Sequence, residues 1–128
     1  MAQESLRRWG HPYPMTFDFG TLGDQYPPGT VAAAAPLPSH PATRCGLWVS
    51  LRPLDALFAL PPALQQAYVD HEVGHCLGLP HPDDPPGVLS LMNHHYLVGI
   101  TALDIARYRA LWPSVRPYAV TVPAVAHD

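Results

Sequence analysis

The chain has 128 residues, of which 48% are apolar and 13% charged, and its formal net charge is −3. This apolar content excludes a disordered chain, and the charge argues against nucleic acid or an anionic membrane surface as a partner. A run of about 20 apolar residues is absent, which excludes a membrane-spanning helix. We therefore expect one globular domain over residues 1–128, with short elements because the chain contains 17 prolines.

The N-terminal third predicts little regular structure. Residues 5–14 are expected to form an irregular lead-in, and the alternation in residues 15–19 predicts a first strand. Prolines surround the alanine run that follows, so residues 30–34 are expected to form a short strand or plain loop. The first 14 residues lack the apolar core of a signal peptide. This predicts a cytoplasmic protein as numbered, or a secreted one if the chain follows a removed leader.

The clearest strand signal lies at residues 46–51, where β-branched and aromatic residues are bounded by a glycine and a proline. Two cysteines, Cys45 and Cys76, flank the middle of the chain. One pair does not make a disulfide framework, and we expect Cys76 to be a small buried apolar residue rather than a metal ligand.

A central helix is predicted from Pro62 to Leu77, since a proline suits the first turn of a helix. It is apolar on two sides, which indicates a helix buried between a sheet and a lower subdomain. His71 and His75 are four residues apart and so lie on one face, one above the other. Two imidazole nitrogens spaced by one turn suit two corners of a tetrahedral Zn²⁺ site.

The residues around these histidines complete a catalytic metal motif. Glu72 lies off their shared face and is placed to take a proton from a water bound to the ion. Gly78 can end the helix in the left-handed conformation, so that the chain turns and brings His81 back as a third nitrogen ligand. One position then remains for water, as in a catalytic rather than a structural zinc site.

From His71 to His81 the chain reads HEVGHCLGLPH, and this HExxHxxGxxH pattern resembles the metzincin zinc peptidases. Their second signature, a methionine-containing turn, is matched by Met92 a short way downstream. No glutamate follows Glu72, which argues against the gluzincin ligand set, and His81 has a better spacing than any downstream aspartate of an aspzincin set. The resemblance spans residues 46–113; residues 1–45 match only loosely, and residues 114–128 are expected to be a tail.

The resemblance implies an α+β metzincin-like zincin domain: a small mixed sheet packed on the active-site helix, then the Met-turn and a C-terminal helix. It implies one catalytic Zn²⁺, with Met92 as an apolar floor beneath it. It also implies that the strand before the active-site helix is a sheet edge that binds peptide by strand addition. The residues assigned on this basis are the ligands His71, His75 and His81, the base Glu72, and the edge-strand residues Leu47, Trp48 and Val49. The alternative for this strand is a core strand with Trp48 buried.

Three further features have open interpretations. His94 and Tyr96 are candidate donors to the reaction intermediate or walls of a specificity pocket. Asp83 and Asp84 are candidates for the structural Ca²⁺ that the family often holds, for hydrogen bonds to a ligand histidine, or for plain solvation. Cys45 resembles the cysteine switch of matrixin propeptides, although its flanking residues differ.

The last element has clear start and stop signals. Thr101 as N-cap and Asp104 three residues later form a variant capping box, and Ile100 with Ile105 matches a hydrophobic staple. The helix is expected from Ala102 to about residue 112, before Pro113.

The predicted function is that of a zinc-dependent endopeptidase, which hydrolyses peptide or protein substrates with a metal-activated water and Glu72 as general base. One alternative is a zinc-containing domain that binds a peptide or protein without cutting it. The small size and the lack of a long helix ahead of the active-site helix favour that alternative. Another is a peptidase dedicated to its own chain or to one target protein.

Overall fold

The computed structural model describes residues 1–23, 25–36, 43–52, 56–93 and 98–113. These residues form a small mixed α+β fold, which confirms the α+β part of the expected fold class. Among them, no helix is long and apolar enough to cross a membrane. The elements in chain order are α1 (Ala2–Trp9), β1 (Thr16–Thr21), β2 (Ala32–Pro36), β3 (Arg44–Val49), the 3-10 turn η1 (Leu57–Ala59), α2 (Pro62–Cys76) and α3 (Ala102–Leu111).

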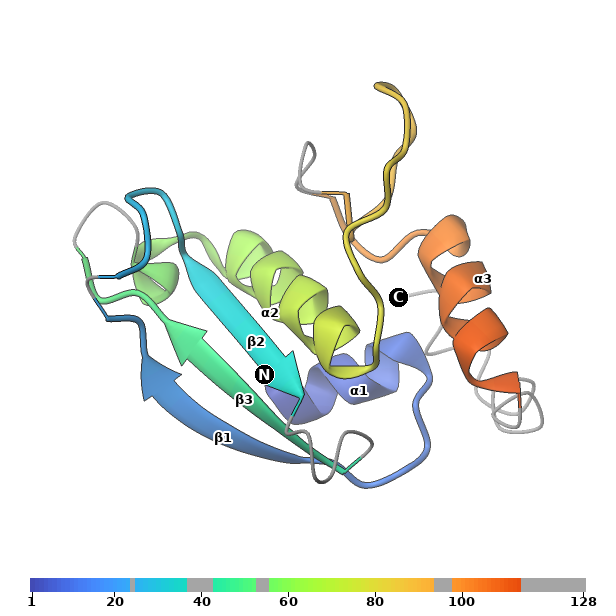
Figure 1. The fold of residues 1–128 in the computed structure, drawn as a ribbon, viewed down its shortest axis with the longest axis horizontal. Coiled ribbons are helices and arrows are strands. Elements are labelled where there is room, and N and C mark those ends of the chain that lie inside the picture. Colours follow the sequence, from blue (N-terminus) through green and yellow to red (C-terminus); the bar gives the residue numbers. More distant parts are fainter. Residues whose placement is uncertain (24, 37–42, 53–55, 94–97, 114–128) are drawn as a thin grey trace.

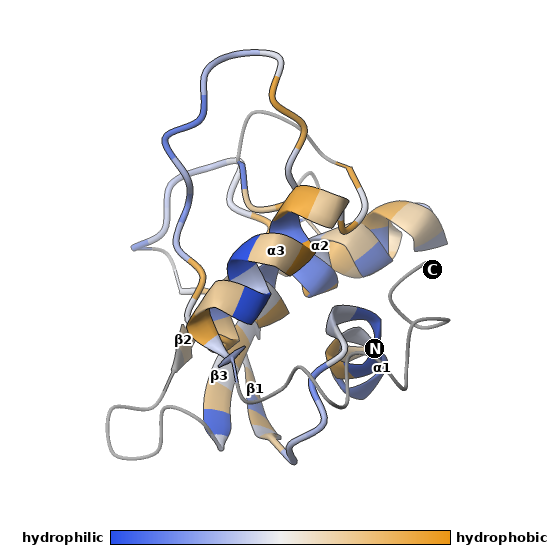
Figure 2. Cartoon of the chain, turned by 90° about the vertical axis from the view of Figure 1, so that its right-hand side faces the viewer, coloured by the Kyte–Doolittle hydropathy of each residue, from blue (hydrophilic) through white to orange (hydrophobic). Residues whose placement is uncertain are grey.

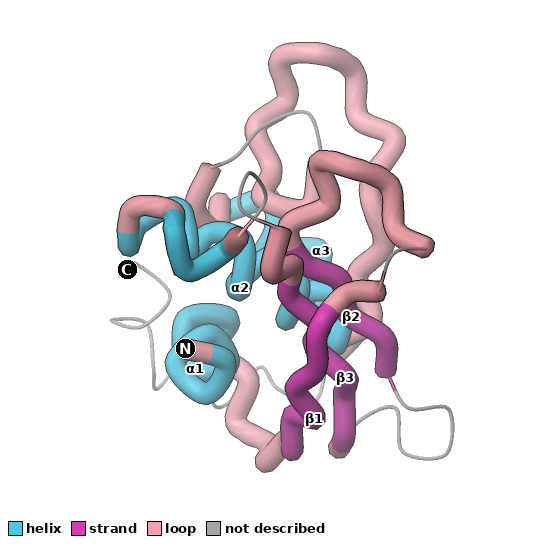
Figure 3. The backbone as a smooth tube through the Cα atoms, turned by 90° about the vertical axis from the view of Figure 1, so that its left-hand side faces the viewer, coloured by secondary structure: helices cyan, strands magenta, loops and turns pink. Residues whose placement is uncertain are grey.

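The three strands form one sheet in the order β1-β3-β2. Strand β1 pairs with β3 in parallel, and β2 pairs with β3 antiparallel, with Ala32 opposite Val49. Helices α1 and α2 lie on one side of this sheet (Figure 3), and α2 runs beside β2 (Figure 1). The sheet therefore supports α2 from one side along its length.

The expected placement of Leu47, Trp48 and Val49 on a sheet edge is wrong. These residues lie on β3, which is paired on both sides and has no free edge to offer a peptide. The error has a physical reason, because aromatic and β-branched residues mark a strand that packs well but do not say which neighbours it pairs with. Within the described residues, the edge strand beside α2 is β2, built mainly of alanines.

The N-terminal segment forms a helix where an irregular lead-in was expected. Leu6 and Trp9 lie on one face of α1 and are buried, and Gly10 ends the helix in the left-handed conformation with φ 77°. Trp9 Nε1 donates a hydrogen bond to the Asp70 carbonyl at 2.9 Å, and Arg8 Nε donates to the Asp70 carboxylate at 2.9 Å. Helix α1 is therefore fastened to α2 one residue before His71.

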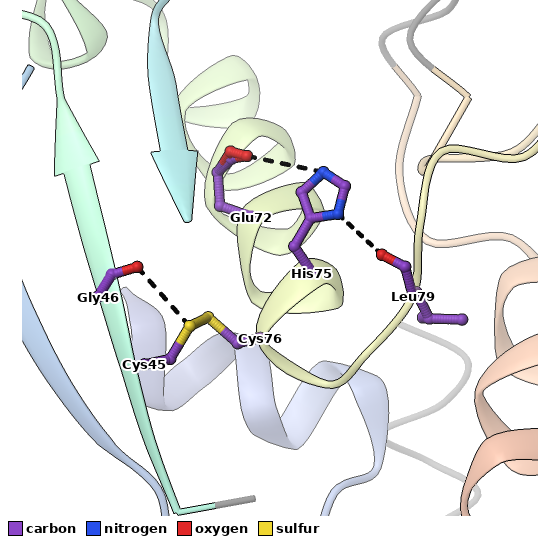
Figure 4. Close-up of a disulfide and its surroundings, with 6 residues drawn as sticks. All are labelled: Cys45, Gly46, Glu72, His75, Cys76 and Leu79. Atoms are coloured by element: carbon purple, nitrogen blue, oxygen red, sulfur yellow. Dashed lines mark hydrogen bonds and ion pairs between the residues drawn. A yellow bond between two sulfur atoms is a disulfide. The ribbon is translucent and has the colours of Figure 1, made fainter. Parts of the chain in front are cut away.

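Cys45 and Cys76 form a disulfide, a bond that the cysteine count did not predict. The two Cα atoms are 5.6 Å apart, and the cysteines are 0% and 1% exposed. The bond joins the central strand to the last residue of α2 (Figure 4). Cys76 is buried as expected but is not a free thiol, and Cys45 faces the helix C-terminus instead of acting as a switch on the metal.

Helix α3 begins as the sequence predicts. Thr101 Oγ1 accepts a hydrogen bond from the Asp104 amide, and the Asp104 carboxylate accepts one from the Thr101 amide, so that a complete capping box is present. Hydrophilic and hydrophobic residues alternate along α3 (Figure 2). Its buried residues are Asp104 and Tyr108, and Trp112 just beyond its end donates from Nε1 to the Leu77 carbonyl at 2.9 Å. The contact between Trp112 and Leu77 holds the end of α3 against the end of α2.

Candidate metal centre

Three histidine nitrogens converge at the C-terminal half of α2. The Nε2 atom of His81 lies 3.1 Å from that of His71 and 3.1 Å from that of His75. Helix α2 positions the first two rings one turn apart, and the loop after it returns the third. This is the one group of three or more candidate metal-binding side chains found among the described residues.

The turn that returns His81 depends on Gly78. Its φ is 96°, in the left-handed region that the sequence predicted for this position. The Gly78 amide donates to the His75 carbonyl, and the Leu79 amide donates to the Gly74 carbonyl, so the last carbonyls of α2 are satisfied as the chain reverses. The reversal also brings the Leu79 carbonyl beside the His75 ring.

Backbone carbonyls fix the tautomers of the two helical histidines. His71 Nδ1 lies 2.8 Å from the Leu91 carbonyl oxygen, and His75 Nδ1 lies 2.8 Å from the Leu79 carbonyl oxygen. Because a carbonyl only accepts, each Nδ1 must carry the proton and donate it. In the neutral rings both Nε2 atoms then present lone pairs, the arrangement found in histidines that bind metals.

This arrangement has more acceptors than donors. The Nε2 atom of His81 carries at most one proton, which it can donate to only one of the Nε2 atoms of His71 and His75, each 3.1 Å away. At the other contact, two nitrogen lone pairs would face each other. A cation between the three nitrogens removes that conflict. Tetrahedral Zn²⁺ with Zn–N bonds of about 2.0–2.1 Å spaces its nitrogens by about 3.3 Å, close to the two separations seen.

Burial favours the neutral form of the helical histidines. It lowers the pKa of His71 to about 4, with the Leu91 hydrogen bond acting in the opposite direction, and it lowers the pKa of His75 as well. A metal ligand must be deprotonated, so both rings are suited to ligation at neutral pH.

Glu72 lies beside this cluster with its side chain buried. Its Oε1 is 4.0 Å from His75 Nε2 (Figure 4), and its carboxylate accepts no hydrogen bond from any described residue. Burial raises the pKa of Glu72 to about 7. The group is therefore poised between its protonated and ionised forms near neutral pH, as a residue that takes and returns a proton requires.

Met92 packs against α2 at Gly74 and is 1% exposed. A Cβ added to Gly74 would clash with the Met92 sulfur and approach Trp9 Cζ2 to 3.0 Å, so the absent side chain lets the methionine pack against the helix. The role of Met92 as an apolar floor remains an expectation.

The sequence analysis missed the anchor of the Met92 turn. Asp104 was recognised only as a capping residue, yet its buried carboxylate also accepts from Ser90 Oγ and from the Leu91 amide at 2.8 Å. A carboxylate at N3 of a helix with a serine 14 residues upstream gives no local signal of this contact, because only the tertiary fold brings the turn onto the helix.

The remaining candidates lie apart from this cluster. Asp84 accepts two hydrogen bonds from the Arg107 guanidinium, at 2.7 and 2.8 Å, which engage both carboxylate oxygens, and Asp83 is exposed. Neither belongs to a metal-binding group in the described part of the chain. His94 and Tyr96 lie outside the described residues.

Comparison of the chain with family models, with curated proteins and with solved structures found no match.

Proposed function

We propose that the chain is a zinc-dependent endopeptidase of metzincin type, with His71, His75 and His81 holding the ion. The observation that carries this proposal is the convergence of three Nε2 atoms, two of them with Nδ1 engaged by backbone carbonyls. Three nitrogen ligands leave one coordination position for a reactant, which distinguishes a catalytic site from a closed structural one. When bound, zinc polarises a water and the substrate carbonyl oxygen.

Glu72 supplies the proton transfers. Its carboxylate accepts a proton from the attacking water and then delivers it to the amine that leaves, so one group serves both halves of the hydrolysis. Burial supports this role, because it removes competing hydrogen bonds and raises the pKa of Glu72 to about 7. A domain that only binds peptides has no need of such a base.

Strand β2 is the proposed docking edge for the substrate. It is one of the two outer strands of the described sheet, and Glu72 extends from α2 toward it (Figure 4). An unpaired edge recognises an extended peptide through backbone hydrogen bonds, whatever the peptide's sequence. In this proposal the peptide lies between β2 and the histidine cluster, and β2 rather than β3 is the strand that binds it.

The disulfide bears on the compartment. Buried disulfides form and persist where the surroundings are oxidising, and the cytosol keeps most thiols reduced. We therefore propose that the protein works outside the reducing cytosol.

The test is cleavage of an internally quenched peptide library by the zinc-loaded wild type beside Glu72→Gln. Glutamine preserves the shape of the side chain but cannot take up the proton. We expect cleavage by the wild type only, with equal zinc content in both. Zinc in both proteins and cleavage by neither would refute the peptidase and favour a domain that captures a peptide without cutting it. Cleavage confined to self sites, seen by mass spectrometry, would indicate a dedicated target.

A further inference from the structure

A cavity of about 350 Å³ lies between the sheet and α2. Its wall includes side chains that differ widely in exposure. Phe19 and Phe58 are 73% and 65% exposed, while Leu47 and Leu57 are 5% and 1% exposed. Glu72, 6% exposed, also lines it. The cavity therefore extends from the molecular surface to the candidate catalytic base.

The lining is apolar apart from Glu72. Its residues come from α1 and α2, from all three strands and from η1. None of the side chains in this wall carries a positive charge, and the Glu72 carboxylate would repel an anion. The wall offers an apolar molecule continuous contact with few polar groups to desolvate.

Small side chains leave this space open. Ala32 of β2 pairs with Val49, which lies on the same face of β3 as Cys45, and Cys45 is bonded to α2. Ala32 therefore faces the interior between sheet and helix, at a position where most core strands carry a larger residue. A well-packed domain of this size contains few such voids.

We propose that this cavity is a binding site for a compact, uncharged apolar molecule, which it holds in contact with Glu72. The volume sets the size of the occupant. A buried apolar cavity of about 150 Å³ holds one benzene ring, so this one suits a molecule of about two fused rings. The space is too small for a helix or strand of a partner protein.

The consequence for activity rests on the proposed function. An occupant that touches Glu72 displaces water from that part of its surroundings, and the base then acts in a drier site. Binding itself depends on neither zinc nor cleavage, so it is tested separately.

The binding test is ¹⁹F NMR of 2-fluoronaphthalene titrated with the full chain as isolated. We expect saturable binding by the wild type, and no saturable binding of 2-naphthoate, the matched anion, in competition. The variant Ala32→Phe fills the cavity and should abolish binding. Ala35→Phe makes the same change on the exposed outer face of the same strand and should leave binding unchanged.

Phe58→Ala is a second variant, and we expect it to leave the packing of the core unchanged because Phe58 is largely exposed. It should raise the dissociation constant by removing part of the wall. Absence of saturable binding by the wild type, or binding by Ala32→Phe as tight as by the wild type, would overturn the proposal. Either result leaves the peptidase proposal standing. Conversely, absence of cleavage by the zinc-loaded wild type would refute the peptidase and leave this binding proposal standing.

Discussion

His71 Nδ1 donates a hydrogen bond to the carbonyl oxygen of Leu91, 2.8 Å away, and so ties α2 to the turn that carries Met92. The same turn is anchored from the other side, because the Leu91 amide donates to Asp104. The orientation of the His71 ring therefore depends on a carboxylate that does not touch it.

The first prediction concerns this relay. Asp104→Asn should weaken zinc binding by about 10- to 100-fold, the range for groups that orient a metal ligand. It should also lower the free energy of unfolding by about 2 kcal/mol. The reason is that Ser90 Oγ and the Leu91 amide donate to the carboxylate in the wild type, and the asparagine amide group would turn N–H groups toward one of them. Competition with a chelator measures the first effect, and urea unfolding the second. The control is Asp18→Asn, which breaks an exposed pair with Arg44 and should change neither. Unchanged zinc affinity in Asp104→Asn would exclude the relay.

The disulfide gives the second prediction. It closes a loop with a sequence separation of 31 residues, and loop closure of that length stabilises a fold by about 3–4 kcal/mol. The double variant Cys45→Ala, Cys76→Ala should lose about that much free energy of unfolding. Thiol labelling of the wild type unfolded without reductant, followed by mass spectrometry, should find no reactive thiol. Two labelled cysteines in the oxidised protein would contradict the bond.

The packing of Met92 against α2 gives the third prediction. Gly74→Ala adds a methyl group against the Met92 sulfur in a fully buried setting. We expect a loss of about 1–3 kcal/mol in the free energy of unfolding, although alanine favours a helix more than glycine does. Gly99→Ala is the matched control, since nothing lies within 4 Å of an added Cβ there. A gain in thermal stability for Gly74→Ala would show that the methionine moves aside easily.

His11 gives the fourth prediction, on pH. Burial lowers its pKa from 6.5 to about 4, and its Nδ1 lies 2.6 Å from the Tyr108 hydroxyl. The unfolded chain therefore binds more protons than the folded one between these two values, so stability falls as the pH is lowered from about 6.5 to about 4. The loss assigned to His11 is at most about 3 kcal/mol. Urea unfolding of zinc-loaded wild type and His11→Phe at pH 7.5 and 5 should show a smaller pH dependence in the variant. Equal pH dependence in the two proteins would contradict this assignment.

Local signals predicted much of this structure. Helix α2 begins at Pro62 as expected and ends within one residue of the predicted position, because a first-turn proline and a left-handed glycine mark its two ends. The capping box of α3 is equally local. The grouping of His71, His75 and His81 followed from helix periodicity and one sharp turn, both of which depend on neighbours in sequence.

The features that were missed depend on tertiary contacts. The pairing of Cys45 with Cys76 follows from β3 packing over the end of α2, and no spacing rule applies to a single pair. The position of β3 at the centre of the sheet follows from the order of pairing, not from its own residues. Helix α1 was missed because it is short, its exposed face carries Glu4 and Arg7, and its buried face (Ala2, Ser5, Leu6 and Trp9) includes a polar residue.

The central claim is that three histidines hold one catalytic zinc ion beside Glu72. The most direct measurement is zinc per chain after dialysis against a zinc buffer, for the wild type, Glu72→Gln and His75→Phe. We predict one zinc per chain in the first two and none retained in His75→Phe, because two remaining nitrogens do not complete the site. Absence of zinc from the wild type, or full retention by His75→Phe, would contradict the account.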